Sequence, residues 1–277
     1  MVRLLKIEWN KLYYYKTARM FIITYFVLMA LVGFGISQFS SNINGAEINF
    51  VQLGAFDFPY VWQNVTYFVA IGKIFLAVII ITNITNEYSN RTLKQNLIDG
   101  LSKKEFLGSK MITNIAFALA STIFIFVICL VLGTYYTQGN ESLFQGIEFI
   151  AAYLVKLVFF FTFCMFLAFL FKKTAFSLML LFVWWILEKI GRIAESGIRY
   201  GILKQDIMNN SKFFTDYLPL ESSSNLISFP DVEIGNYIMG GKLFTQGSVD
   251  WTFMVSTCIY TLVFVYLSYT LLQKRDL

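Results

Sequence analysis

Long apolar runs separated by polar connections dominate this chain. A helical membrane span needs about 20 mainly apolar residues, and six of the runs are of that order. The chain lacks the strict apolar–polar alternation over about ten residues that is typical of membrane β-strands. Since lipid admits only helices and closed barrels, the pattern predicts an all-α polytopic membrane protein, with residues 1–277 forming a single six-span transmembrane domain. The predicted spans are approximately Met20–Gln38, Thr66–Thr85, Met111–Tyr135, Phe149–Phe171, Thr174–Ile190 and Trp251–Leu272.

The first polar segment, residues 1–19, places apolar and aromatic side chains at helical spacing with basic side chains between them. This pattern predicts an amphipathic interfacial elbow helix whose aromatic side lies among lipid headgroups. A basic flank that only orients the next span is the alternative, and the two interpretations are compatible. The apolar positions are Leu5, Trp9, Leu12 and Tyr13, and the basic ones are Arg3, Lys6, Lys11 and Lys16.

The longest connection, residues 191–250, follows the fifth span. Two i,i+4 pairs at its start, Glu188 with Arg192 and Glu195 with Arg199, indicate that the fifth helix continues beyond the bilayer or bends along its surface. Prolines and glycines farther on predict a loop with short helical pieces at most. This loop either caps an exit pathway or simply joins two helices.

Composition agrees with a membrane location. Charged residues make up only 14% of the chain, whereas soluble domains carry about a quarter. Too little polar surface is therefore available to cover a water-soluble globule. The net charge of +5 is consequently interpreted as a signal of topology.

Lysine and arginine are distributed unevenly among the connections. Because basic connections remain on the cytoplasmic side of a membrane, six spans with both termini cytoplasmic satisfy the distribution. Residues 191–250 then form an external loop. The basic segments are residues 1–19, Asn86–Lys110, Lys172–Lys173 and Lys274–Arg275, and those without lysine or arginine are Phe39–Val65 and Tyr136–Glu148.

Several kinds of chemistry lack the residues that they need. The chain has no histidine, which excludes histidine-based acid–base catalysis and the commonest metal ligand. Cys129, Cys164 and Cys258 fall in separate apolar runs and are interpreted as small buried hydrophobic residues. The closest approach to a phosphate-binding loop, residues 235–243, lacks its lysine and hydroxyl positions. We therefore expect no catalytic, cofactor-binding or metal-binding residues, no enzyme activity and no nucleic-acid partner.

Three ionisable residues, Lys73, Lys156 and Glu188, fall inside predicted spans. Ionisable groups are costly in lipid and are therefore functional candidates. In one interpretation Lys73 and Glu188 form an intramembrane polar pair that holds the helices in register, while Lys156 extends its ammonium group toward the membrane surface. In the other, these residues form a polar ring that gates the outer half of a translocation path.

The polar segment Asn86–Lys110 separates the second and third spans. It contains a glutamate, a Thr-Leu pair that opens a short amphipathic helix, a Gly-Leu-Ser-Lys turn, and a lysine before the third span. This pattern resembles the permeases of the type-two exporter family of ABC transporters. The family usually has glycine where this chain has Arg91, and proline where it has Gly100. The matching positions are Glu87, Thr92, Leu93, Ser102, Lys103 and Lys110.

The resemblance extends over essentially the whole chain, since the family also has an elbow helix, six spans and an enlarged external segment between the fifth and sixth spans. It implies the permease subunit of an ATP-driven ABC exporter with an unidentified substrate, located in the bacterial cytoplasmic (inner) membrane. The short helix within residues 86–110 would then be a coupling helix that docks on a separate cytoplasmic ATPase. Two ATPase subunits and a second permease copy, identical or related, would complete the transporter.

The resemblance also implies which residues couple the permease to the ATPase. Charges on the segment suit a polar protein interface, and Leu93 and Leu97 on one helix face would supply an apolar anchor. An ordinary positive-inside loop is the alternative for the segment, and a non-transporting membrane scaffold or sensor that recruits a cytoplasmic partner is the alternative for the chain. The expected coupling residues are Glu87, Arg91, Thr92, Leu93, Leu97, Ser102 and Lys103.

Overall fold

The computed structural model describes residues 8–11, 13–38, 40–43, 46–49, 51, 53–137, 142–202, 212–230, 244 and 247–274. Six helical segments are long and apolar enough to cross a membrane, which confirms the predicted number of spans. These segments are α2 (Lys16–Gln38), α3 with α4 (Tyr60–Val69 and Lys73–Ser89), α6 (Lys103–Tyr136), α7 (Glu148–Phe171), α8 (Thr174–Ser196) and α11 (Trp251–Lys274).

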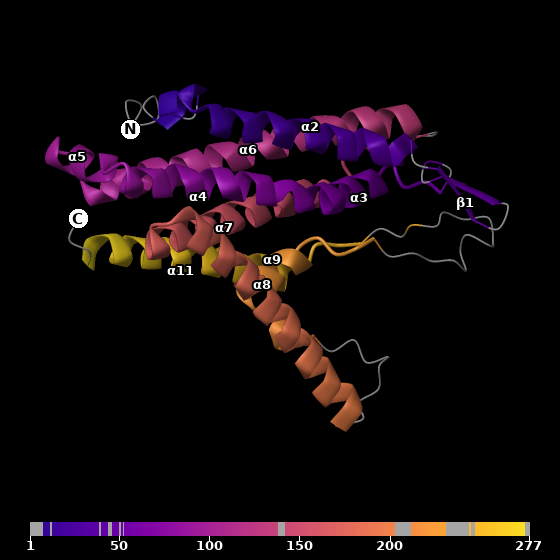
Figure 1. Cartoon of the computed structure of the whole chain (residues 1–277). Helices are drawn as coiled ribbons and strands as arrows, with labels where there is room; N and C mark the ends of the chain where they lie inside the picture. The colour runs from indigo at the N-terminus through magenta and orange to yellow at the C-terminus, as the bar shows by residue number, and fades with distance from the viewer. Residues whose placement is uncertain are drawn as a thin grey trace.

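Smaller elements connect the spanning helices. At one end of the bundle lies α5, near the last turn of α11, and at the other end a two-stranded antiparallel hairpin interrupts the otherwise helical fold (Figure 1). The sequence pattern does not predict this hairpin. The smaller elements are β1 (Ser40–Ile43), β2 (Ala46–Asn49), η1 (Ala70–Gly72), α5 (Thr92–Ile98), η2 (Gly197–Ile202), η3 (Thr215–Tyr217) and α9 (Pro219–Asn225).

Helix α7 is the centre of the bundle. It contacts α3, α4, α6, α8, α9 and α11. In its most apolar stretch 67% of the residues are buried, against 11% in the corresponding stretch of α8. Phenylalanines dominate the buried part of α7, with Phe159 and Phe163 packing on Phe264 of α11. Helix α8 instead leans away from the other spans along most of its length (Figure 1), so its apolar face stays uncovered in the single chain.

The second span is longer than the predicted Thr66–Thr85, because α3 begins at Tyr60 and joins α4 through the short 3₁₀ turn η1. Polar residues at the start of α3 hide this turn of helix from a hydropathy pattern. In the structure they are buried and bonded: the Asn64 side chain donates to the carbonyl of Ala55 at 2.6 Å, and the Gln63 amide oxygen accepts from the N–H of Gly247 at 3.1 Å. Burial of these amides is tolerated because they have partners.

The third span begins at Lys103, about two turns before the predicted Met111. Ser102 explains the early start, because its side chain accepts from the N–H of Glu105 while the Glu105 carboxylate accepts from the N–H of Ser102. This reciprocal capping box satisfies N–H groups that the first turn of a helix leaves without partners. The later part of the polar segment is therefore the beginning of α6.

The described part of the predicted elbow segment is helical at residues 8–11 and 13–14, and the helix breaks at Tyr15 before α2 begins. Leu5, Leu12, Arg3 and Lys6 lie outside the described residues. Amphipathic docking of residues 1–19 on a membrane therefore stays a prediction.

The fifth helix does extend as predicted, through α8 into the π-helical turn η2. The predicted pair of Glu195 with Arg199 is confirmed at 2.9 Å. The predicted pair of Glu188 with Arg192 is wrong. Arg192 turns to Glu221 of α9 instead, because α9 folds back against α8.

Close contact between Gly133 of α6 and the turn before α3 gives the first test of this packing. A Cβ at Gly133 would overlap the ring of Phe58, which is completely buried. Gly133→Ala is therefore expected to lower the free energy of unfolding by about 1–3 kcal/mol, the usual cost of overpacking. Thermal unfolding of the purified chain measures this loss. Gly35→Ala is the matched control, since nothing lies within 4 Å of the added Cβ there; equal stability of the two variants would contradict the predicted clash.

Candidate functional site

The polar segment between the second and third spans folds into a short helix held between two long ones. Helix α4 ends at Ser89, α5 runs from Thr92 to Ile98, and α6 begins at Lys103. Arg91 takes a left-handed conformation with φ 54°, and Gly100 after α5 has φ 96°. Glycine favours this region of backbone space, so Arg91 occupies a position where the backbone suits glycine.

One face of α5 packs on its own bundle and the other is exposed. Leu93 is only 1% exposed, and Leu97 is partly buried against the core. In the single chain this leucine therefore fixes α5 to its own spans, and its role as an anchor for the ATPase stays a prediction. On the outer face, Arg91, Lys94 and Ile98 are exposed, with Ile98 at 76%.

Four charged residues, three of them buried, form an ion cluster behind α5. Lys110 of α6 lies 2.6 Å from Glu8 and 2.5 Å from Glu87 of α4, and its side chain is 1% exposed. Lys11 contacts the same two carboxylates, Glu87 at 3.0 Å and Glu8 at 3.4 Å. The ion cluster therefore joins the N-terminal segment, the end of α4 and the start of α6. The last two are the helix ends that flank α5. The formal charge of the ion cluster is zero.

Burial and neighbouring charges shift the pKa values of Glu8 and Lys11 in opposite directions. At Glu8, burial raises the pKa of the carboxyl, but the nearby charges of Lys110 and Lys11 and hydrogen bonds from Lys110 and Asn83 leave the pKa below its ordinary value. At Lys11, burial lowers the pKa of the ammonium group, but the charges of Glu87 and Glu8 and hydrogen bonds to them leave the pKa above its ordinary value. Both directions favour the charged forms, so Glu8 and Lys11 stay ionised near neutral pH.

The remaining residues of the motif have structural contacts. Thr92 donates to the carbonyl of Glu87 at 3.4 Å, Ser102 caps α6, and Lys103 donates to the carbonyl of Gln273 in the last turn of α11 at 3.2 Å. The structure thus gathers the seven predicted coupling residues around α5, and of these seven it leaves Arg91 and Ser102 exposed. Sequence reasoning did not identify Glu8 and Lys11 as members of the same cluster.

An open groove of about 570 Å³ adjoins α5 and reaches the turn between α7 and α8. Arg91 and Lys172 line this groove, and they are the two non-glycine residues with positive φ among those described. Each such residue costs about 1–3 kcal/mol, and such strain concentrates at functional sites. The groove also contains exposed basic groups. Its lining comprises Glu87, Tyr88, Ser89, Arg91, Leu93, Lys94, Phe171, Lys172 and Lys173.

The predicted intramembrane polar pair is not formed in the structure. The ammonium group of Lys73 lies over the ring of Phe160, 4.5 Å from its centroid. Glu188 accepts hydrogen bonds from the Trp184 indole at 2.6 Å and from the N–H groups of Leu220 and Glu221 at 3.2 and 2.8 Å. The two residues thus have separate partners.

Glu188 and Lys156 hold the two ends of α9. The N–H groups bonded to Glu188 belong to the first turn of α9, and Lys156 donates to the carbonyl of Ser224 near its other end at 3.2 Å. A carboxylate at the N-terminus and an ammonium group at the C-terminus both complement the helix dipole. Lys156 is 4% exposed, so the expectation that it extends toward the membrane surface is wrong.

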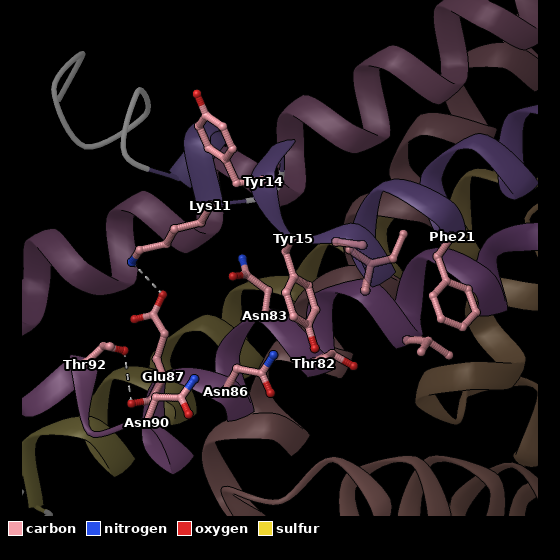
Figure 2. Close-up of a pocket in the computed structure, with 13 residues that line it drawn as sticks. Lys11, Tyr14, Tyr15, Phe21, Thr82, Asn83, Asn86, Glu87, Asn90 and Thr92 are labelled. Carbon is pink, nitrogen blue, oxygen red and sulfur yellow. Dashed lines mark hydrogen bonds and ion pairs between the residues drawn. The ribbon is translucent and has the colours of Figure 1, made fainter.

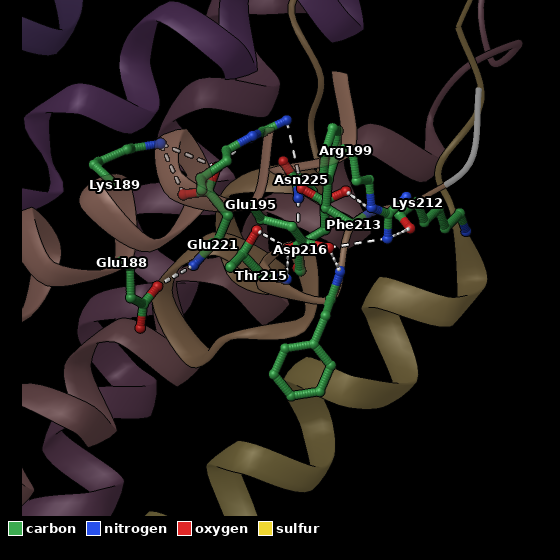
Figure 3. A network of polar contacts seen from close by, with 12 residues as sticks. Glu188, Lys189, Glu195, Arg199, Lys212, Phe213, Thr215, Asp216, Glu221 and Asn225 are labelled. Atoms are coloured by element: carbon green, nitrogen blue, oxygen red, sulfur yellow. Dashed lines mark hydrogen bonds and ion pairs between the residues drawn. The ribbon is translucent and has the colours of Figure 1, made fainter. Parts of the chain in front are cut away.

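Further ion pairs fasten α8 to the segment before α11. Lys189 and Arg192 of α8 both pair with Glu221, the former at 2.7 Å. Glu195 accepts from the N–H groups of Phe214 and Thr215 (Figure 3). These contacts place α9 where α7, α8 and α11 meet (Figure 1).

Two of the three cysteines behave as expected. Cys129 and Cys164 are buried and free, whereas Cys258 is exposed on α11. The prediction of a buried position for Cys258 is wrong, because α11 is covered on one side only.

Comparison with known proteins gives one match. The sequence model of one family, described as "ABC-2 family transporter protein", matches residues 4–188. The matched region begins before the ion cluster and ends at Glu188, so it includes α5, the first four spans and part of the fifth. No curated protein matches the chain.

Proposed function

Since this chain belongs to the ABC-2 transporter family and is thus the membrane permease component of an ABC transporter, we propose that it couples ATP hydrolysis by a separate cytoplasmic ATPase to export of a substrate. The observation that carries the proposal is the suspension of α5 between α4 and α6, with a buried face toward the spans and a basic face outward. In this arrangement α5 is the coupling helix.

Rigid attachment makes α5 suitable for this role. Leu93 fixes α5 to the bundle, and the ion cluster joins the two helix ends on either side of it. A push on α5 would therefore move α4 and α6 as bodies, because packed elements respond by rigid shifts. The ATPase itself would supply the nucleotide site.

The outward basic groups define the kind of surface that the ATPase would present. Arg91, Lys94 and Lys172 lie along the groove beside α5, so an acidic surface on the ATPase would be complementary. Exposed Ile98 adds an apolar contact. In this proposal, α5 and both chain termini face the cytoplasm of a bacterial cell.

A second permease copy, identical or related, completes the proposal. Helix α8 leaves the bundle with its apolar side chains uncovered, including Phe182 at 60% and Ile193 at 70% exposure. This face supports contact with a second permease, with lipid covering what remains. Two ATPase subunits would then bind the two copies of α5.

Charge reversal at the groove tests the coupling role. The double variant Arg91→Glu/Lys94→Glu is expected to weaken binding of the partner ABC ATPase by at least about tenfold, because attraction to an acidic surface becomes repulsion. Binding in detergent and ATP hydrolysis by the complex measure the effect. Both side chains are exposed, so the fold should be retained.

Lys274→Glu is the matched control. Lys274 is exposed at the same end of the bundle but does not line the groove, so its reversal should leave binding unchanged. Equal loss in both variants would indicate only long-range charge, and unchanged binding in the double variant would refute docking at α5. A stable complex in which the permease does not influence hydrolysis would favour the scaffold alternative.

A further inference from the structure

A cavity of about 380 Å³ opens between the N-terminal segment and α4, next to the ion cluster but on the other side of α4 from the basic groove. One wall comes from residues 11–21 and the other from residues 78–92 (Figure 2). The coupling role proposed above makes no use of this cavity.

Both walls change polarity in the same direction. On α4, Val78 and Ile79 are followed by Asn83 and Asn86, and then by Asn90 beyond the helix end. At 1.5 Å per residue, positions 78 to 90 extend over about 18 Å along the helix axis. The cavity is therefore apolar toward the middle of the spans and amide-rich toward the α5 end.

The opposite wall repeats this order. Phe21 and Ala18 of α2 face the apolar part, and Tyr15, Tyr14 and Lys11 follow toward the α5 end (Figure 2). Tyrosine is enriched at the level of lipid headgroups because it has an apolar ring and a polar hydroxyl. An amphiphile aligned with the spans matches both walls.

Polar groups in the cavity are available to a ligand. The side chains of Asn86 and Asn90 make no hydrogen bond within the described part of the chain, and Asn86 is half-buried. Glu87 also lines the cavity, but its Oε1 already accepts from Lys11 and Lys110, and its Oε2 is buried. Amides donate and accept, whereas a carboxylate only accepts.

Fixed charges select among headgroups. The ion cluster contributes two carboxylates and two ammonium groups, so it offers no net attraction to an anion. A headgroup with its own phosphate and its own N–H donors satisfies the site: asparagine amides donate to the phosphate, and asparagine oxygens accept from the ammonium group.

We propose that this cavity binds one phospholipid of the adjacent leaflet, with a zwitterionic headgroup carrying a primary ammonium. Its acyl chains lie along Phe21, Val78 and Ile79, and its headgroup lies among Asn86, Asn90 and Tyr15. The bound lipid fills the space between the N-terminal segment and α4, and thus supports the ion cluster from outside.

Native mass spectrometry of the delipidated chain, with defined lipids added back, tests this assignment. Phosphatidylethanolamine is expected to be retained at one molecule per chain, about tenfold more tightly than phosphatidylcholine, because loss of a charge-assisted hydrogen bond has about that effect. Anionic phosphatidylglycerol should also bind more weakly. Equal retention of the ethanolamine and choline lipids, or a preference for the glycerol lipid, would overturn the headgroup assignment.

Two variants locate the site. Asn86→Leu should abolish the preference for the ethanolamine headgroup, and Ala18→Phe should fill the apolar part and remove retained lipid of every kind. Asn10→Leu is the control, since Asn10 is exposed and does not line the cavity. Retention by Asn86→Leu equal to that of the control would place the lipid elsewhere. Absence of any retained lipid would assign the cavity to a protein partner and refute the proposal.

Discussion

Replacement of Lys110 by methionine is expected to lower the free energy of unfolding by about 3–5 kcal/mol, because removal of one partner leaves buried charge uncompensated. Lys110 is the most buried member of the ion cluster and contacts both carboxylates. Without it, Glu8 and Glu87 share only Lys11. Thermal or denaturant unfolding of the purified chain measures the loss, and the complex with the ATPase should lose activity because the ends of α4 and α6 are no longer joined.

Lys11→Met is the matched control within the same cluster. The Lys11 side chain is 34% exposed, so water compensates in part for its removal, and a loss of about 1 kcal/mol is expected. The double variant Lys110→Met/Glu8→Gln should be more stable than Lys110→Met, because it restores a neutral balance. Equal effects of Lys110→Met and Lys11→Met would contradict the central position of Lys110.

Glu188→Leu is the second substitution with a large expected effect. Three donors, the Trp184 indole and the N–H groups of Leu220 and Glu221, would lose their acceptor. A buried donor left without a partner costs about 1–3 kcal/mol, so a total loss of about 3 kcal/mol or more is expected. Release of α9 should also speed tryptic cleavage at the exposed Lys212, which gives a local readout besides thermal unfolding.

Glu188→Gln and Glu195→Leu complete this experiment. The glutamine keeps one acceptor oxygen and should lose less stability than the leucine variant. Glu195 makes similar contacts on the same helix but is more exposed, with 18% of its side chain accessible, so Glu195→Leu should cost less. Because Lys73 and Glu188 have no common partner, Lys73→Met and Glu188→Gln should have additive effects on stability, to within about 0.5 kcal/mol. Strong coupling between them would instead support the intramembrane polar pair.

Hydropathy was sufficient to predict the six spans, because the length of an apolar run follows directly from the thickness of a membrane. It located the ends of the spans less well. Asn64 and Gln63 obscure the start of α3, since a hydropathy pattern does not reveal that their side chains have partners. Ser102 and Glu105 have the spacing of a capping box, and this local pattern indicates the early start of α6 at Lys103.

Contacts across long stretches of chain were not predictable in the same way. Glu8 and Lys110 are 102 positions apart, and no local pattern connects them. Lys156 and Glu188 both bond to α9, which folds back among α7, α8 and α11, and not to the partners that the sequence suggested. The position of α9 depends on tertiary packing, which local sequence patterns do not describe. These patterns therefore indicated that the charges needed partners, but they did not identify the partners.

The length of α6 has a mechanical consequence. Its 34 residues form a continuous rod of about 51 Å, whereas the hydrocarbon layer is about 30 Å thick. About 20 Å of the rod therefore projects from that layer and acts as a lever arm with its fulcrum among the packed spans. A tilt of about 5° about the midpoint displaces each tip by roughly 2 Å over a half-length of about 25 Å. A small displacement of the α6 tip next to α5 would thus move the other tip of α6, at the opposite membrane surface, by nearly the same distance in the reverse direction.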